Sequence, residues 1–257
     1  MLIFFLCSCN SKNGNSDVII DVDDEFRLTF LEDLSTPQND LLFRLESIDN
    51  KGCESDTVLL ELNNFGNALS MNVNVRSAQA PCDVGQTKAF TQNTTGILDR
   101  TNYPLSIRLQ ELLSNPGDLL IDEKSYQLSM ETTYGFYLPY DQLQKIPKGM
   151  LWGYVAYTPL FEDRAVEFVE EILALSAPQD LAPGQYGYFE MNADQELLIP
   201  EAEAENILTI PFYRSFDVAN SRSLQNLIDS YQNSNSGMRF VMWDSYGKVY
   251  WVLRPKY

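Results

Sequence analysis

Alternating apolar and polar residues between positions 41 and 76 constrain the fold more than any other feature of the chain. Successive side chains of a β-strand point to opposite faces, so this alternation predicts strands with one buried and one solvated face. The clearest case is 69–76, Leu-Ser-Met-Asn-Val-Asn-Val-Arg. Residues typical of a tight turn occupy 63–67, so the 58–62 and 69–76 strands are expected to form a hairpin.

Further short strands follow at regular spacing, with no helical pattern between them. Apolar alternation predicts them at 105–109, 119–121, 126–130 and 151–157. A Pro-Gly pair at the centre of Asn115–Asp118 predicts a type II turn. Such a series favours an antiparallel, immunoglobulin-like β-sandwich for residues 25–160 rather than alternating strands and helices.

The pattern changes near residue 160, and helical periodicity begins. Asp163 is expected to cap a helix over 164–176 with Val166, Val169 and Ile172 on its apolar face, and a second helix is expected over 221–232. Shorter strands are predicted around and between the helices, at 186–191, 196–199, 207–213, 238–243 and 248–253. Residues 161–257 are therefore expected to form a smaller α+β domain with two helices.

Charge and composition exclude several classes of function. The formal net charge is −18, with 36 acidic and 18 basic residues, which argues against a nucleic-acid partner because phosphate binding needs a basic face. The chain contains no histidine, so histidine-dependent triads and di-histidine zinc sites are ruled out. We expect no metal and no cofactor.

The first nine residues indicate export. An apolar run from Leu2 to Leu6 ends at small and polar residues, as a signal-peptide core does at its cleavage site. Leu6-Cys7-Ser8-Cys9 resembles the lipobox of bacterial envelope lipoproteins, and the resemblance implies that Cys9 carries the lipid. No basic residue precedes the run, which favours a translation start upstream of Met1. The alternative is a buried N-terminal strand or helix.

The resemblance implies the following organisation. Residues 1–8 are the remnant of a signal peptide, and 9–24 are a lipidated polar tether to the folded part. In its short lipobox, its acidic, Asn-rich composition and its predicted sandwich, the chain resembles uncharacterised lipoproteins of the Bacteroidota. The implied location is the cell envelope, with membrane attachment through the N-terminal lipid.

Two cysteines remain once Cys7 leaves with the signal and Cys9 is acylated. In an exported protein Cys53 and Cys82 are expected to form a disulfide, which ties strand ends together. A metal site at these two cysteines is the weaker alternative, because no other soft ligands accompany them.

Aromatic and acidic residues give two functional hypotheses. Tyr137, Tyr140 and Tyr246 lie in predicted loops and could hold a glycan or a protein partner, although core packing is the commoner role of such residues. The first hypothesis is a non-catalytic binding or assembly component. The second is a carboxylate-dependent hydrolase such as a glycoside hydrolase, which needs two facing carboxyl groups. The candidate carboxyl groups belong to Glu190, Asp194, Glu196 and Asp244, for which a solvated surface is the alternative role.

Overall fold

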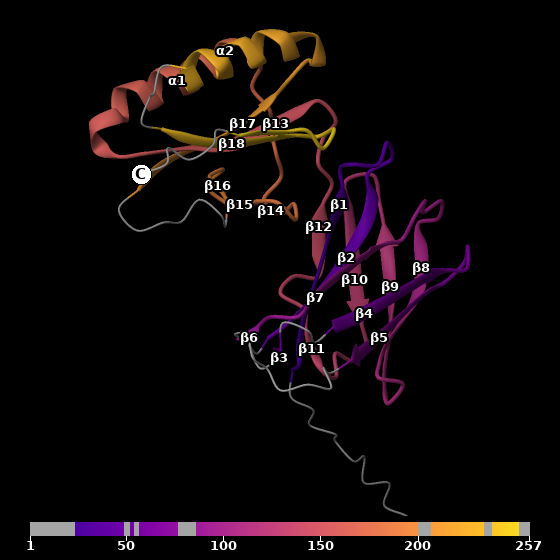
Figure 1. The fold of residues 1–257 in the computed structure, drawn as a ribbon. Coiled ribbons are helices and arrows are strands. Elements are labelled where there is room, and N and C mark those ends of the chain that lie inside the picture. The colour runs from indigo at the N-terminus through magenta and orange to yellow at the C-terminus, as the bar shows by residue number, and fades with distance from the viewer. Residues whose placement is uncertain are drawn as a thin grey trace, which may run out of the picture.

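The structure is a computed structural model that describes residues 24–48, 52–53, 57–76, 86–199, 207–233 and 238–251. These residues form a mainly β fold with several sheets, and with two α-helices in the C-terminal half (Figure 1). The predicted mainly β character and the two helices are confirmed.

The N-terminal half contains two larger sheets. The first has the order β11-β1-β2-β7 and the second the order β12-β10-β9-β8-β5-β4. The strands of the first sheet are β1 (Phe26–Asp33), β2 (Asp40–Ser47), β7 (Phe90–Thr94) and β11 (Phe136–Tyr137). Those of the second are β4 (Thr57–Asn64), β5 (Leu69–Arg76), β8 (Asn102–Leu109), β9 (Leu113–Ile121), β10 (Ser125–Met130) and β12 (Gln142–Gln144). A short separate ladder joins β3 (Gly52–Cys53) to β6 (Gln86–Thr87).

One hydrophobic core lies between the two larger sheets. Phe30 and Phe43 of the first sheet and Met71 and Tyr103 of the second are all fully or almost fully buried in it. The alternation at 69–76 therefore reflects a strand with one buried face, because Leu69, Met71 and Val73 face this core, although Val75 is exposed. The predicted β4–β5 hairpin is confirmed, with Gly66 in the turn at φ +80°.

Two strand pairs are parallel, so the expectation of a purely antiparallel arrangement is wrong there. β5 pairs with β8 in parallel, and β1 pairs with β11 in parallel. Parallel neighbours need a long crossover connection, and the segment 77–101 supplies one between β5 and β8.

The predicted turn at Asn115–Asp118 is also wrong. β9 runs through these residues, and the chain reverses earlier, at Gln110 and Glu111, which have φ values of +51° and +59°. Gly117 instead allows β9 and β10 to approach each other closely, since a Cβ there would lie 2.5 Å from the carbonyl oxygen of Ser129 in β10.

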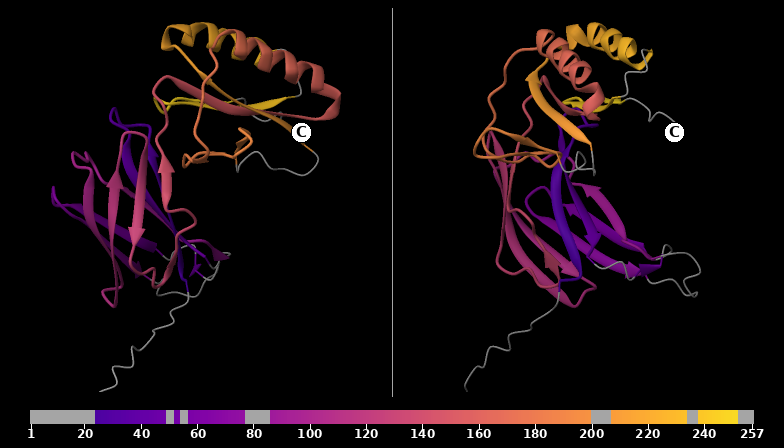
Figure 2. Two further views of the ribbon diagram at one scale, coloured as in Figure 1. Left: turned by 180° about the vertical axis from the view of Figure 1, so that it is seen from behind. Right: turned by 90° about the vertical axis from the view of Figure 1, so that its left-hand side faces the viewer.

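The C-terminal half is built on a four-stranded sheet of order β17-β13-β18-β19. Its elements are β13 (Met150–Tyr157), the 3-10 helix η1 (Pro159–Phe161), α1 (Glu162–Ala174), β17 (Leu208–Ser215), the 3-10 helix η3 (Val218–Asn220), α2 (Ser221–Asn233), β18 (Arg239–Asp244) and β19 (Val249–Trp251). A smaller sheet contains β14 (Gly184–Gln185), β15 (Glu190–Met191) and β16 (Leu197–Leu198). The two helices cover one face of the four-stranded sheet and the smaller sheet covers the other (Figure 2).

Strand β13 occupies the centre of this C-terminal sheet. The expectation that the 151–157 strand completes the N-terminal series is wrong, because β13 pairs with β17 on one side and β18 on the other. All eight of its residues are buried, since both faces of the strand are covered. Where the chain divides into domains stays a prediction.

Both predicted helices are confirmed, although details of the first differ. The N-cap of α1 is Phe161 rather than Asp163, because η1 leads directly into the helix and places Asp163 in its first turn. The buried face includes Phe168 and Ile172, whereas Val166 is exposed.

The two halves of the chain are packed tightly together. Leu34, next to β1, and Ile146 share a hydrophobic core with Trp152 of β13. The Tyr188 hydroxyl donates a hydrogen bond of 2.8 Å to the carbonyl oxygen of Glu32. A Cβ at Gly247 would lie 2.6 Å from the carbonyl oxygen of Leu34, so only glycine fits there. The β1–β2 turn is thus fixed against the C-terminal half.

Candidate binding groove

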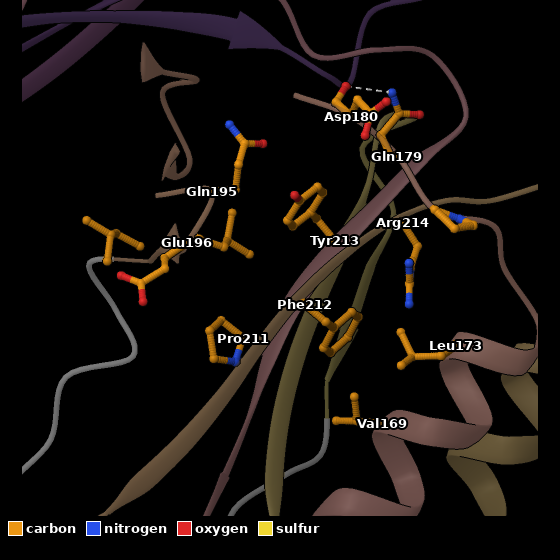
Figure 3. A pocket seen from close by; sticks show the side chains of 13 residues that line it. Val169, Leu173, Gln179, Asp180, Gln195, Glu196, Pro211, Phe212, Tyr213 and Arg214 are labelled. Atoms are coloured by element: carbon orange, nitrogen blue, oxygen red, sulfur yellow. Dashed lines mark hydrogen bonds between the residues drawn. The ribbon is translucent and has the colours of Figure 1, made fainter. Parts of the chain in front are cut away.

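A groove of about 680 Å³ runs along β17 in the C-terminal half (Figure 3). Its walls come from α1, from the segment after α1, from β16 with the residues before it, and from β17. The lining residues are Val169, Leu173, Pro178, Gln179, Asp180, Gln195, Glu196, Leu197, Leu198, Pro211, Phe212, Tyr213 and Arg214.

The groove lies at the edge of the four-stranded sheet rather than over one face. Four consecutive residues of β17, Pro211 to Arg214, line it. Neighbouring side chains of a strand point to opposite faces, so a cavity over one face would contact only alternate residues. The sheet order agrees, because β17 is a terminal strand with β13 as its only neighbour in the described sheet.

Alternate residues of β17 direct their backbone groups away from β13. At the end of the strand, Ser215 exchanges two hydrogen bonds with Ala177, through its N–H at 2.9 Å and its carbonyl oxygen at 3.0 Å. Outward and inward residues alternate in an antiparallel pair, and the β13–β17 register is continuous. Tyr213, Pro211 and Thr209 therefore direct their backbone groups away from β13. Proline fits this position because the N–H that it lacks would not reach β13.

Apolar side chains form much of the groove wall. Val169 and Leu173 come from α1, and Leu197 and Leu198 from β16. Leu198 remains 47% exposed, which leaves apolar area available for contact.

Polar side chains of both charges also line the groove. Asp180 and Glu196 are exposed carboxylates, and Arg214 is a cation (Figure 3). The Nε atom of Arg214 is buried and has no hydrogen-bond partner among the described residues. Neither carboxylate forms an ion pair with it there. The groove lining therefore contains an arginine whose Nε–H has no acceptor among the described residues.

The structure places the three tyrosines predicted for binding in separate surroundings. Tyr137 and Tyr246 are 50% and 54% exposed, as expected. Tyr140 was predicted to be exposed, and this is wrong. Its ring packs on that of Phe30 with 5.3 Å between the ring centroids, and its hydroxyl donates to the carbonyl oxygen of Phe30. Tyr137 is in β11, at the end of the N-terminal sheets away from the β18–β19 turn that contains Tyr246 (Figure 1). The three do not form one surface.

Of the four predicted carboxylates, Glu196 is the one that lines the groove. Asp244 is buried and accepts hydrogen bonds from the N–H groups of Tyr246 and Lys248, so it holds the β18–β19 turn. Glu190 pairs with the side chain of Gln185, and Asp194 is exposed. Sequence reasoning missed Asp180 and Arg214; the one available signal was Pro211 within a strand pattern, which marks an edge strand.

A further carboxyl group missed in the sequence, that of Glu32, is buried in the N-terminal half. Glu32 accepts a hydrogen bond of 2.8 Å from the N–H of Ile146 and one of 3.4 Å from the Tyr126 hydroxyl. Burial raises the pKa of the Glu32 carboxyl above its ordinary value, although these hydrogen bonds oppose the shift. Its contacts are internal, so its role is structural.

The predicted lipid and disulfide sites lie outside the described residues or side chains. Cys9 and Cys82 are not described, and of Cys53 only the backbone is described, in β3. The β3–β6 ladder pairs Cys53 with Gln86, four positions after Cys82. Both sites stay predictions.

Within the described ranges, no three residues among histidine, cysteine, aspartate and glutamate are grouped as a metal site would require. None of the helices described here has the length and apolar character needed to span a membrane. Comparison with known proteins gives no match to a family model, a curated protein or a solved structure.

Proposed function

We propose that this protein is a lipid-anchored component of the bacterial cell envelope that binds an extended segment of a protein partner. The lipid is attached at Cys9, and the segment binds in the groove along β17. In this proposal the N-terminal half is an immunoglobulin-like sandwich fixed by a Cys53–Cys82 disulfide. Two sheets around one core and the pairing of β3 with β6 support that part.

The outward-facing edge of β17 is the observation that carries the binding role. Tyr213 offers both an N–H and a carbonyl oxygen to the groove, and Pro211 offers a carbonyl oxygen. An extended peptide satisfies such groups by adding a strand to the sheet. Ala177 already pairs with Ser215 in this way, so the edge of β17 at the end of the groove has the geometry that an added strand needs. Backbone pairing of this kind favours a polypeptide over a glycan.

Selection from random-sequence peptides displayed on phage tests this role, with purified protein as bait. We expect enriched peptides whose binding is lost in Leu198→Lys, which places a charge in the groove. Leu120→Lys is the matched control, because Leu120 is a similarly exposed leucine of β9 outside the groove, at 39% exposure. Absence of enriched peptides, or equal loss in both variants, would contradict the proposal.

The anchor has its own test. Cys9→Ala should move the protein from the membrane fraction to the soluble fraction, and mass spectrometry of the native protein should find acyl chains on Cys9. A wild-type protein that is already soluble and unacylated would rule out the anchor.

A carboxylate-dependent hydrolase remains the second candidate, because Asp180 and Glu196 line the same groove. Two carboxyl groups can hydrolyse a glycosidic bond when one acts as acid and the other as base or nucleophile. Screening wild type, Asp180→Asn and Glu196→Gln against chromogenic glycosides tests this. Activity in the wild type that both substitutions abolish would support it, whereas an inactive wild type would exclude the substrates tested.

A further inference from the structure

We propose that the bound segment carries an aspartate or glutamate side chain that pairs with Arg214. This inference rests on the proposed peptide-binding role and specifies the ligand of the same groove.

The Arg214 side chain is the group that points to a carboxylate. Its Nε–H is buried without an acceptor among the described residues, although the side chain belongs to the groove lining (Figure 3). A buried donor without a partner is unfavourable, so a small shift of this side chain toward a ligand acceptor in the groove would be favourable. Guanidinium binds carboxylate through two parallel hydrogen bonds, which makes a carboxylate the best matched acceptor.

The two carboxylates that line the groove do not fill this role. Glu196 accepts instead from the amide of Asn192 at 2.9 Å, and Asp180 forms no ion pair with Arg214 in the described part of the chain. The chain has a net charge of −18, so its long-range field does not attract an acidic segment. Recognition of the carboxylate must therefore be local, through contact with Arg214.

The place of Arg214 in β17 determines where the acidic residue lies along the bound strand. Arg214 follows Tyr213 directly, and its side chain is on the same side of the sheet as Phe212, which packs in the core beneath the helices. Side chains directly opposite each other in a strand pair share a face. The acidic residue should therefore neighbour the residue that bonds to the backbone of Tyr213, with its side chain toward α1.

The test uses the peptides selected on the wild-type protein as probes. We expect them to share one acidic position, and Arg214→Gln should weaken their binding roughly tenfold or more. Arg214→Lys should restore part of the affinity. Arg100→Gln is the control, because Arg100 is an exposed arginine outside the groove. Changing the acidic residue of the peptide to its amide should have little further effect on Arg214→Gln, since the contact is already lost.

The outcomes separate this inference from the proposed function. If Leu198→Lys abolishes binding of the selected peptides but Arg214→Gln leaves it unchanged, the inference is overturned and the proposed binding role of the groove stands. Peptides without a shared acidic position would do the same. A failure to select any peptide would overturn both. If Arg214→Gln lowers the melting temperature and leaves peptide affinity unchanged, the role of Arg214 is structural and the inference is wrong.

Discussion

Proline substitution at two adjacent positions of β17 tests which backbone groups face the groove. Ile210 is paired with Val155, which is fully buried in β13, and its N–H points toward β13 in the alternation set by Ser215. Thr209 has the opposite orientation. Proline removes the N–H, so the same substitution should have different effects at these neighbouring positions.

The cost in unfolding free energy depends on whether the lost N–H had a hydrogen-bond acceptor in β13. At 210, proline removes a ladder bond and leaves the buried carbonyl oxygen of Val155 without a donor, which costs about 2–4 kcal/mol in total. At 209 no ladder bond is lost, so the cost should stay below about 1 kcal/mol. The alanine variants Ile210→Ala and Thr209→Ala provide the reference, so that loss of the original side chains cancels.

Urea unfolding followed by tryptophan fluorescence measures these free energies. The change from alanine to proline should be large at 210 and small at 209. Equal costs at both positions, or a larger cost at 209, would show that the assigned backbone directions are wrong and that no open edge faces the groove.

Three further predictions concern stability. Asn115→Ala should lower the free energy of unfolding by about 3 kcal/mol in urea titrations, because the buried amide bonds to the backbone of Tyr134 in both directions and to the Thr132 hydroxyl. Relative to Glu32→Gln, the wild type should be most stable below the ordinary glutamate pKa near 4.5 and should lose stability as pH rises through the raised pKa of the folded state; unfolding at acid and neutral pH tests this, and the opposite slope would refute it. Replacing both Cys53 and Cys82 by serine should cost roughly 3–4 kcal/mol, and peptide mapping without reductant should find the two linked; two unpaired thiols would contradict the disulfide.

Local patterns predicted the elements better than their pairing. The strict alternation at 69–76 and the periodicity of 221–232 were sufficient for β5 and α2, because each reflects one buried face. The parallel β5–β8 pair could not be predicted, since it depends on a crossover that contains no local signal of direction. β13 was found as a strand but assigned to the wrong sheet, because burial on both faces gives no preference for one neighbour.

The groove was less predictable than the fold. Its walls come from α1, β16 and β17, which meet only in the folded chain, so no motif marks it. The three tyrosines predicted to bind a ligand do not form one surface, and the Tyr140 hydroxyl donates to the backbone carbonyl of Phe30. An isolated arginine such as Arg214 has no sequence signature, and its missing partner is visible only in three dimensions.

Amide hydrogen exchange of β17, measured with and without a selected acidic peptide, shows whether the edge of β17 accepts an added strand. We expect saturating peptide to slow exchange of the outward-facing amides of Tyr213 and Thr209, while the inward-facing amides of Phe212 and Ile210 change little. Unchanged exchange along 208–214, or protection confined to a surface remote from β17, would contradict the claim that this edge binds an added strand.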